Sequence, residues 1–417
     1  YEAETVQQEP VEVLGRPSAS GNNFHNTSPD SFADRFDKFQ KVAVNAICND
    51  FKEKVNGRFL LVIPTGGGKT FTAVKSINSL YESGVLSSED RVLWTAHRVE
   101  LISQAKDTFT KYEERFPDKP SYKEKVDFKM IGAVNASILR DPKTKLVVID
   151  EAHHGAANSY LPIFERTNLG ILGLTATPTR HDGKPLEFER ESFSVGFPDL
   201  VEMGVVLRPE VRTIEGGTYY FSFSDENEGL EELNNAPRNQ RIIGSLLDKN
   251  EDYNKVIIYV GTKNHVYSLY RELNESSLKG RYESISYVTG DGNSRGQTRE
   301  DYFSQEKTYK RSIIVNVDVL TEGYDDPSIN TVVMARPTSS KLIYMQSMGR
   351  AIRHDPNNDL KRAYILEVAD VLPNIRYRID NRWLYSDISD ALEPAVIDRE
   401  FSSSAEFEQV LIKVYSE

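Results

Sequence analysis

The sequence predicts an α/β fold with two parallel sheets, and three observations support this fold class. Short apolar runs alternate with longer polar stretches of helical periodicity, which is typical of parallel strands joined by crossover helices. The alternation occurs in two successive series of similar length, separated by an acidic, Asn-rich stretch at residues 225–235. With 417 residues, the chain is long enough for two or three domains that each have a core.

The first series opens with a helix and continues with short apolar runs. Apolar residues recur at helical spacing at Phe32, Phe36, Phe39, Val42, Ala43, Ala46 and Ile47. The runs that follow predict strands at residues 59–63, 92–94, 146–149 and 171–174. Cys48 falls within the helix, where we expect a small core residue. Because it is the single cysteine of the chain, an internal disulfide and a cysteine-based zinc site are excluded.

The second series has strands but no glycine-rich loop of its own. It predicts strands at residues 256–260, 285–288, 313–317, 332–335 and 363–366. From the two series we expect a linker or N-terminal arm at residues 1–29, a first domain at 30–207, a second domain at 208–370 and a C-terminal extension at 371–417. The arm is rich in Gln, Glu, Pro, Ser and Asn and has little periodicity, which is typical of a segment without a packed core.

Composition and charge limit the classes of partner. Charged residues make up 27% and hydrophobic residues 39% of the chain, as in ordinary soluble proteins. The formal net charge of −12 argues against non-specific adhesion to nucleic acid. Acids outnumber bases by five to one in residues 1–30 and by nine to five in residues 371–417, so a basic groove between the ends is compatible with the total. No apolar run reaches the ~18 residues of a membrane helix and no targeting peptide is visible, so we expect no membrane partner and a cytoplasmic location.

A glycine-rich loop follows the first predicted strand and precedes a helical pattern. Such a loop can wrap its backbone N–H groups around a polyphosphate, because only glycine lets the backbone come so close, and the helix N-terminus adds its dipole. Lys69 would reach the β- and γ-phosphates and Thr70 would hold Mg²⁺. The loop residues are Thr65, Gly66, Gly67 and Gly68; the strict pattern has glycine where this chain has Ile63. The alternative is a glycine-rich turn with a surface lysine.

Two carboxylates directly follow the predicted strand at residues 146–149. This position is the C-terminal edge of the sheet, where open α/β sheets bind ligands. Asp150 can hold Mg²⁺, and Glu151 can orient and deprotonate an attacking water. The alternative is a solvated turn, which we regard as weaker because the phosphate loop lies about eighty residues earlier.

Two further motifs are weaker by themselves. Thr175 and Thr177 follow the strand at residues 171–174 and could relay hydrogen bonds between a nucleotide site and another surface. Gln346, Arg350 and Arg353 share one helical face, and an arginine pair suits a γ-phosphate. The alternatives are a Thr/Pro turn and a solvated basic helix. We expect an arginine that serves a γ-phosphate not to serve the core.

In this order and spacing, the motifs resemble those of superfamily 2 helicases of the DEAH kind. Within that superfamily the chain is most similar to RadD/UvsW/XPB-type DNA helicases and to the motors of restriction systems. Residues 174–183, 318–327 and 335–338 are especially similar to RadD-like proteins. The resemblance covers about residues 35–370. It implies two RecA-like domains in tandem with an ATP cleft between them, and ATP and Mg²⁺ as cofactors.

The resemblance also implies a role for individual residues at the nucleotide. Gln40 resembles the glutamine that reads adenine, although Asp37 stands where the family usually has a basic residue. The residues implied in the nucleotide site or in catalysis are Thr65, Gly66, Gly67, Gly68, Lys69, Thr70, Asp150, Glu151, His153, Asp325, Gln346, Arg350 and Arg353. Contact with nucleic acid, or coupling to its movement, is implied for His97, Arg98, Thr175, Thr177, Thr289, Gly290 and Thr321. The second histidine, His154, matches no motif, and we expect a structural role for it.

These motifs favour an ATP-dependent DNA translocase or helicase, in which ATP closes the cleft between the domains and hydrolysis reopens it. A second hypothesis is a nucleic-acid sensor or motor subunit of a restriction or defence complex, with little unwinding of its own and with protein partners at the N- and C-terminal extensions. RNA is a less favoured substrate, supported only by shared motifs. Contacts to the nucleic-acid backbone would carry no sequence information.

Overall fold

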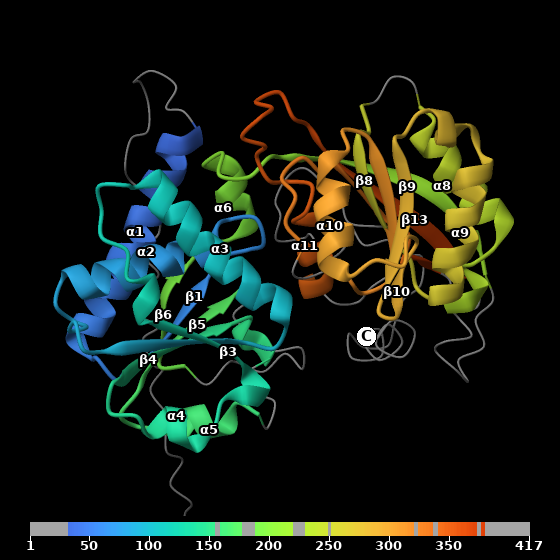
Figure 1. Ribbon diagram of the computed structural model, residues 1–417. Coiled ribbons are helices and arrows are strands. Elements are labelled where there is room, and N and C mark those ends of the chain that lie inside the picture. The colour runs from blue at the N-terminus through green and yellow to red at the C-terminus, as the bar shows by residue number, and fades with distance from the viewer. Residues whose placement is uncertain are drawn as a thin grey trace, which may run out of the picture.

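The computed structural model describes residues 32–154, 159–176, 188–219, 230–248, 252–320, 324–336, 341–372 and 377–379. They form two α/β lobes, each built on one sheet (Figure 1). The N-terminal arm, most of the C-terminal extension, Thr177 and Thr321 lie outside the described residues. Among the helices described, none is both long enough and apolar enough to cross a membrane.

The first sheet contains six parallel strands in the order β3-β2-β4-β5-β1-β6. Its strands are β1 (Arg58–Val62), β2 (Arg91–Ala96), β3 (Val126–Met130), β4 (Thr144–Asp150), β5 (Gly170–Thr175) and β6 (Arg190–Ser194). Its helices are α1 (Phe32–Glu53), α2 (Lys69–Glu82), α3 (Val99–Arg115), α4 (Ala136–Arg140), α5 (Leu161–Phe164) and α6 (Phe197–Glu202). The described residues of this domain also form 3₁₀ turns at η1 (Lys123–Lys125), η2 (Ile131–Ala133) and η3 (Ala152–His154).

Alternate residues of the central strands pack on opposite faces of this sheet. Leu61 joins the cluster formed by α1, α2 and α3, whereas its neighbour Leu60 joins the cluster that includes residues of α4 and α5. Figure 1 shows these two groups of helices on the two sides of the sheet. Because both faces are covered, the middle residues of the central strands are apolar, and this explains why the sequence predicts them.

Two strands of the first sheet are not predicted by the sequence. Strands β3 and β6 form the two edges, and most of their residues are partly or fully exposed. Edge strands carry polar residues on their exposed side, so no apolar run marks them. Val42 lies in α1, as the apolar spacing predicts, but on the exposed side at 60% exposure; the buried side of the helix carries Phe39, Ala43, Ile47 and Phe51. Cys48 is a buried free thiol as expected, and burial raises its pKa to about 11.

The second sheet follows the order β10-β9-β11-β8-β12-β13-β14, and β7 also pairs with β13. The strands are β7 (Pro209–Thr218), β8 (Lys255–Tyr259), β9 (Ser284–Thr289), β10 (Gly292–Asn293), β11 (Ser312–Asn316), β12 (Thr331–Met334), β13 (Ala363–Leu372) and β14 (Tyr377–Ile379). All pairs are parallel except β9–β10 and β13–β14. The helices are α8 (Ala236–Leu246), α9 (Lys263–Glu275), α10 (Arg299–Thr308) and α11 (Lys341–Met348), with a 3₁₀ turn at η4 (Ser277–Gly280).

The second sheet also has two covered faces. Ile258 packs with residues of α8 and α9, whereas Ile257 packs with residues of α10 and α11 in the same cluster that holds the core of the first domain. Figure 1 shows α10 and α11 on the side that faces the first domain. Strand β13 and its antiparallel partner β14 extend the sheet past residue 370, into the stretch that the sequence assigns to the C-terminal extension.

Candidate functional site

The glycine-rich loop connects β1 to α2 with very little space for side chains. Gly66 and Gly68 have φ values of 92° and 81°, in the left-handed region that favours glycine. A Cβ atom at Gly67 would lie 2.5 Å from Ile63 Cγ2, and one at Gly68 would lie 2.4 Å from the Phe36 ring. Gly68 is also the N-cap of α2, and no side chain caps the helix there. The backbone N–H groups at this end of α2 therefore suit an anionic ligand.

Three charged side chains lie close to the glycine-rich loop: Lys69, Asp150 and Glu151. Lys69 Nζ donates to Glu151 Oε1 at 2.6 Å, and both side chains are about nine-tenths buried. Asp150, at the end of β4, is also buried, and its Oδ1 accepts the backbone N–H of Glu151 at 3.0 Å. Glu151 has a φ of 52°, which is unusual for a residue other than glycine. Such backbone strain is typical of functional sites, and here it accompanies a carboxylate held against the lysine of the loop.

His153 connects this carboxylate to the neighbouring strand. Its Nδ1 lies 3.4 Å from Glu151 Oε2 and 3.4 Å from Thr175 Oγ1, at the end of β5. His153 and Thr175 are both buried. The structure thus brings together the predicted residues of β4 and β5 at the C-terminal edge of the sheet.

Gln40 lies beside the loop, on α1. Its side chain is fully buried, and its Nε2 donates to Thr72 Oγ1 at 3.3 Å; Thr72 in turn donates to the carbonyl of Gly68 at 3.1 Å. Lys75 Nζ lies within hydrogen-bond range of Gln40 Oε1, at 3.4 Å, and of Asp37 Oδ1, at 3.1 Å. Burial lowers the pKa of Lys75, against the effect of Asp37. These contacts join α1 to the helix that carries the loop.

The second domain meets the loop through residues that follow α11. A Cβ atom at Gly349 would lie 2.5 Å from Thr65 Cγ2, and one at Gly66 would lie 3.5 Å from Arg353 Cγ. The backbone N–H of Leu207 donates to the carbonyl of Ile352 at 2.7 Å. The glycine-rich loop and the predicted arginine motif therefore lie in direct contact across the two domains.

The two arginines of this motif have different partners. Arg350 is 5% exposed; its Nε donates to the carbonyl of Leu320 at 3.1 Å and its Nη1 to the carbonyl of Tyr324 at 2.6 Å. The expectation that Arg350 does not serve the core is therefore wrong, because its buried guanidinium donates to two backbone carbonyls of its own domain. Gln346 is also buried, at 3% exposure. The predicted helical face shared by Gln346, Arg350 and Arg353 is wrong, because α11 ends at Met348 and both arginines follow the helix.

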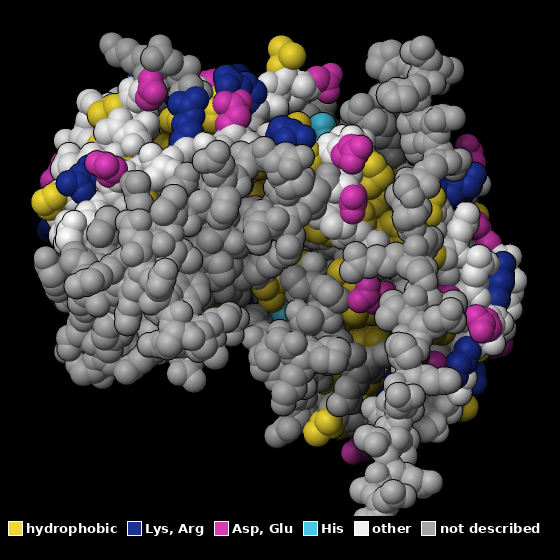
Figure 2. Space-filling view, turned by 180° about the vertical axis from the view of Figure 1, so that it is seen from behind, with side chains coloured by type: hydrophobic (Ala, Val, Ile, Leu, Met, Phe, Trp, Pro, Cys, Tyr) yellow, Lys and Arg dark blue, Asp and Glu magenta, His cyan; other side chains and the backbone are white. Residues whose placement is uncertain are grey.

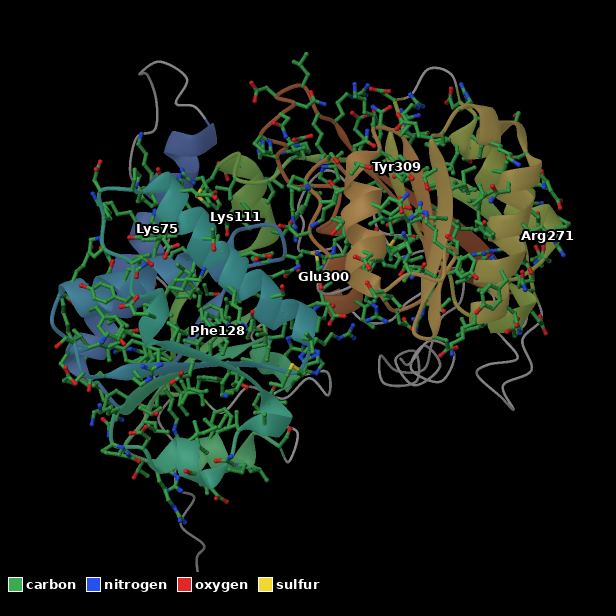
Figure 3. The ribbon with its side chains drawn as sticks, viewed as in Figure 1. Lys75, Lys111, Phe128, Arg271, Glu300 and Tyr309 are labelled. Atoms are coloured by element: carbon green, nitrogen blue, oxygen red, sulfur yellow. The ribbon has the colours of Figure 1, made fainter. Side chains whose placement is uncertain are left out.

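Arg353 instead lies at the domain boundary, paired with Asp325. The charge of Arg353 lowers the pKa of Asp325 to about 2. Lys111 Nζ, on α3 of the first domain, lies 3.4 Å from the same carboxylate. Figure 3 shows Lys111 on the side of the first domain that faces α10 and α11. Asp325 therefore pairs with a basic side chain from each domain, next to the glycine-rich loop.

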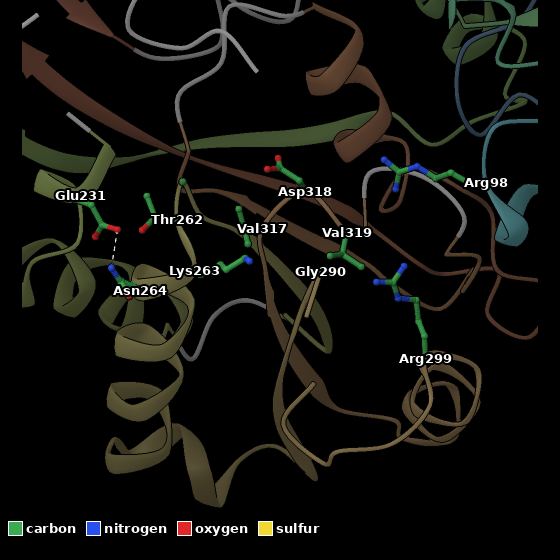
Figure 4. A pocket seen from close by; sticks show the side chains of 11 residues that line it. Arg98, Glu231, Thr262, Lys263, Asn264, Gly290, Arg299, Val317, Asp318 and Val319 are labelled. Carbon is green, nitrogen blue, oxygen red and sulfur yellow. Dashed lines mark hydrogen bonds between the residues drawn. The ribbon is translucent and has the colours of Figure 1, made fainter. Parts of the chain in front are cut away.

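A second feature between the domains is a cavity of about 670 Å³, here called the interdomain cavity (Figure 4). The first domain contributes Arg98, the N-cap residue of α3. The second contributes Thr262 and Lys263 at the start of α9, Gly290 after β9, and Arg299 at the start of α10. Its lining residues are Arg98, Glu231, Gly261, Thr262, Lys263, Asn264, Gly290, Arg299, Val317, Asp318 and Val319. Basic side chains and helix N-termini from both domains thus line one cavity.

The structure separates some residues that the sequence groups at this surface. Gly290 lines the cavity, but Thr289 is 1% exposed and its hydroxyl donates to the carbonyl of Gly292 at 3.3 Å. Arg98 lines the cavity, whereas the neighbouring His97 packs its ring on His154. On the face seen in Figure 2, the coloured basic and acidic side chains are interspersed and do not form one patch of a single sign.

Sequence reasoning missed Thr262, Lys263 and Arg299. The first two come one residue, Gly261, after the strand predicted at residues 256–260, so the strand-end rule that identified Asp150 could have found them. Arg299 carries no such signal, because it begins a helix that is distant in sequence from the other basic residues. Its Nη1 lies 2.9 Å from Glu100 Oε1 on α3. Burial acts to raise the pKa of Glu100, but its own backbone N–H and Arg299 outweigh this effect and lower it.

Family models match both domains. Residues 35–180 match the model described as "Type III restriction enzyme, res subunit", and residues 238–355 match the model described as "Helicase conserved C-terminal domain". Among curated proteins, the chain is 24% identical over 356 residues to the Saccharomyces cerevisiae protein IRC3, whose name describes an ATP-dependent helicase, covering 77% of this chain and 50% of that protein. It is 23% identical to the type I restriction enzyme EcoKI endonuclease subunit of Escherichia coli, covering 98% of this chain and 42% of that subunit.

Solved structures share the fold. The type ISP restriction-modification enzyme LlaBIII, solved bound to DNA, has a TM-score of 0.58 at 16% identity, covering 90% of this chain and 32% of that one. This chain therefore spans half or less of the length of these relatives. Two helicase-family models in tandem on two adjacent α/β domains lead to one conclusion: the chain belongs to superfamily 2 of the helicases, a superfamily of nucleic-acid-dependent ATPases, with a first domain of the kind found in restriction-enzyme motors.

Proposed function

We propose that this chain is an ATP-dependent DNA translocase or helicase that hydrolyses ATP between its two domains. The observation that carries the proposal is the contact between the glycine-rich loop and the residues after α11, with Gly349 against Thr65 and Arg353 beside Gly66. A ligand held by the loop would touch both domains. A change in that ligand would therefore change how the domains fit together.

The residues present fit a nucleoside triphosphate with Mg²⁺. Gly67 and Gly68 leave no space for a Cβ, so their backbone can approach phosphate oxygens closely. Lys69 is the buried cation at the start of α2, and Thr70 and Asp150 would hold the metal ion. Mg²⁺ when bound neutralises charge on the phosphate oxygens. Gln40 would contact the adenine, and Asp325 the nucleotide on the side of the second domain.

Each side chain of this site would have a different role in ATP hydrolysis. Glu151 would orient the attacking water and take its proton, and His153 would keep the Glu151 carboxylate in place through the 3.4 Å contact at Oε2. In the structure Lys69 neutralises Glu151; with phosphates in the loop, Lys69 would turn to them and leave the carboxylate to act as the base. Arg353 would exchange Asp325 for the γ-phosphate, while Arg350 and Gln346 would hold the surrounding chain.

The interdomain cavity is the proposed path of the nucleic-acid backbone. Arg98, Lys263 and Arg299 supply positive charge, and the N-terminus of α9 adds its backbone N–H groups. The residues that line the interdomain cavity come from both domains. Opening or closing of the ATP cleft would therefore move the phosphate contacts of one domain relative to those of the other. Thr175 would link this movement to the nucleotide through His153, and Thr177 and Thr321 remain proposed contacts by resemblance alone.

DNA is the substrate that we favour over RNA. The support is that LlaBIII was solved bound to DNA and that the EcoKI relative is an endonuclease subunit of a restriction enzyme. A second candidate function, a motor or sensor subunit of a restriction or defence complex, is favoured by the alignment of 98% of this chain within 42% of the EcoKI subunit. Protein partners would then bind outside the two domains. A cytoplasmic location is proposed for either function.

One experiment tests both candidates. ATP hydrolysis is measured in parallel with single-stranded DNA, duplex DNA, forked DNA and RNA, and strand separation is followed on the forked substrate. We expect stimulation by DNA. Stimulation without strand separation would favour the motor or sensor subunit, stimulation by RNA alone would overturn the choice of DNA, and hydrolysis that no nucleic acid stimulates would overturn the proposal.

A further inference from the structure

Three histidine rings lie against one another in succession at the C-terminal edge of the first sheet, and this row of rings is here called the histidine stack. The ring centroids of His97 and His154 lie 4.1 Å apart, and those of His154 and His153 lie 4.3 Å apart. The interplanar angles are 51° and 44°, so each pair is tilted. The stack joins two segments that are more than fifty residues apart in sequence: the end of β2 and the 3₁₀ turn η3. His154 is the middle ring.

One end of the stack touches the proposed catalytic group. His153 Nδ1 lies 3.4 Å from Glu151 Oε2 and 3.4 Å from Thr175 Oγ1. Glu151 Oε1 accepts from Lys69 Nζ at 2.6 Å. His153 is 2% exposed, so a shift of its ring requires a shift of the groups packed around it.

The other end leads to the interdomain cavity. His97 directly precedes Arg98, which lines the cavity and is the N-cap residue of α3. A phosphate that engages Arg98 would bias the conformation of the chain at the start of α3. Arg98 in the cavity lining is thus covalently joined to His97, and contacts run from His97 through His154 and His153 to the Glu151 carboxylate.

We propose that His154 is a positioning residue that couples nucleic-acid binding at the interdomain cavity to the placement of Glu151. The inference rests on the proposed function and deepens it. The ring of His154 lies between those of His97 and His153, and its proposed effect passes through these two rings. Close packing transmits small displacements because a filled interior cannot absorb them. Removal of the middle ring would leave His97 and His153 in place but without contact.

The test is a double-mutant cycle on the stimulation of ATP hydrolysis, defined as the rate with saturating single-stranded or duplex DNA divided by the rate without it. The variants are His154→Ala, His97→Ala and the double variant of the full chain. We expect each single substitution to lower the stimulation about tenfold, within the range usual for coupling between two sites. We expect the double variant to lose no more than either single variant, because all three interrupt the same contact.

Rescue and control variants separate coupling from general packing. His154→Phe keeps an aromatic ring in the stack and should restore most of the stimulation. Val99→Ala changes a 65% exposed residue in the same segment, two positions from His97, and should behave as the unchanged chain. Melting temperatures are compared for all variants. If His154→Ala does not stay folded, His154→Gln, which removes the ring but keeps a polar side chain, takes its place in the cycle.

The outcomes distinguish this inference from the proposed function. If no nucleic acid stimulates ATP hydrolysis by the wild-type chain, the proposed function is overturned and the inference with it. If DNA stimulates ATP hydrolysis by the wild-type chain and by His154→Ala to the same extent, the inference alone is overturned. Equal losses of the basal and the stimulated rate, or additive losses in the double variant, would also overturn it, since they indicate ordinary packing.

Discussion

The two halves of the proposed ATP site hold their charged side chains in different ways. In the first domain, Lys69 and Glu151 are paired with each other, so both already lie where a nucleotide in the loop would meet them. In the second domain, Arg350 is bonded to backbone carbonyls and Arg353 to Asp325. A bound phosphate would therefore have to displace a buried partner, Glu151, in the first half and a more exposed partner, Asp325, in the second.

This difference has a physical reason. The Lys69–Glu151 pair is about nine-tenths buried, and separated charges at such a depth would be costly. The Arg353–Asp325 pair is more exposed, with 21% and 32% of the two side chains accessible, so water can compensate for an exchange of partners. The comparison indicates that closure of the site depends on the second domain. The following substitutions test that view, from the largest expected effect to the smallest.

Substitution Arg353→Ala should lower DNA-stimulated hydrolysis by about 10³–10⁵-fold, which is the range for arginines that neutralise the transferred phosphoryl group. The fold should persist, because Arg353 is paired at the boundary and not in the core. Steady-state kinetics and circular dichroism measure the two quantities. A fully active Arg353→Ala variant would mean that the second domain supplies no charge to the reaction.

Substitution Lys69→Ala should lower turnover by about 10³-fold and also weaken ATP binding, because it removes the cation nearest the phosphates. Titration with a fluorescent ATP analogue measures the binding. Thr72→Ser, on the same helix, is the matched control, since it keeps the hydroxyl that bonds the Gly68 carbonyl. Wild-type turnover in Lys69→Ala would reject the assignment of the loop.

Substitution Glu151→Gln should lower turnover by about 10²–10³-fold while ATP binding is retained, because the proposed base is lost but Asp150 can still hold Mg²⁺. Single-turnover hydrolysis and nucleotide titration separate the two effects. If the variant binds no nucleotide, Glu151 serves the structure of the site and not the chemical step.

Substitution Arg350→Ala should lower stability by about 2 kcal/mol or more, because the carbonyls of Leu320 and Tyr324 lose buried charged donors. Chemical denaturation measures the change. This result would separate the two arginines, with Arg353 affecting rate and Arg350 affecting stability. An Arg350→Ala variant of unchanged stability but greatly reduced turnover would instead assign both arginines to the phosphate.

The smallest effect concerns pH. The pKa of Asp325 falls from 3.8 to about 2 in the folded chain, mainly because of Arg353. A carboxyl group with a lowered pKa stabilises the fold above its ordinary pKa, and this contribution is lost as the pH falls through the lowered value. The melting temperature of the unchanged chain should therefore exceed that of Asp325→Asn at neutral pH, and the difference should shrink between pH 3.8 and about 2. A difference that is constant over this window would show that the ion pair does not contribute.

Local sequence was sufficient for much of the fold and for the first half of the site. The central strands are buried on both faces, so each appears as a continuous apolar run, and the glycine-rich loop and the Asp150–Glu151 pair directly follow two of these runs. In a parallel sheet the ends of such strands meet at one edge. The sequence therefore places Lys69 and Glu151 at the same edge of the sheet, and the structure shows that they are in contact.

The tertiary structure decided what depends on partners that are distant in sequence. Strands β3, β6 and β7 are edge or partly exposed strands, which an apolar pattern does not mark. The sequence predicts that Arg350 and Arg353 share a helical face, but α11 ends at Met348, and the fold shows that Arg350 faces carbonyls of its own domain while Arg353 faces Asp325. Likewise, no spacing relates His97 to His154: their rings meet because β2 and β4 are neighbours in the sheet, and neighbouring strands bring together whatever residues follow them.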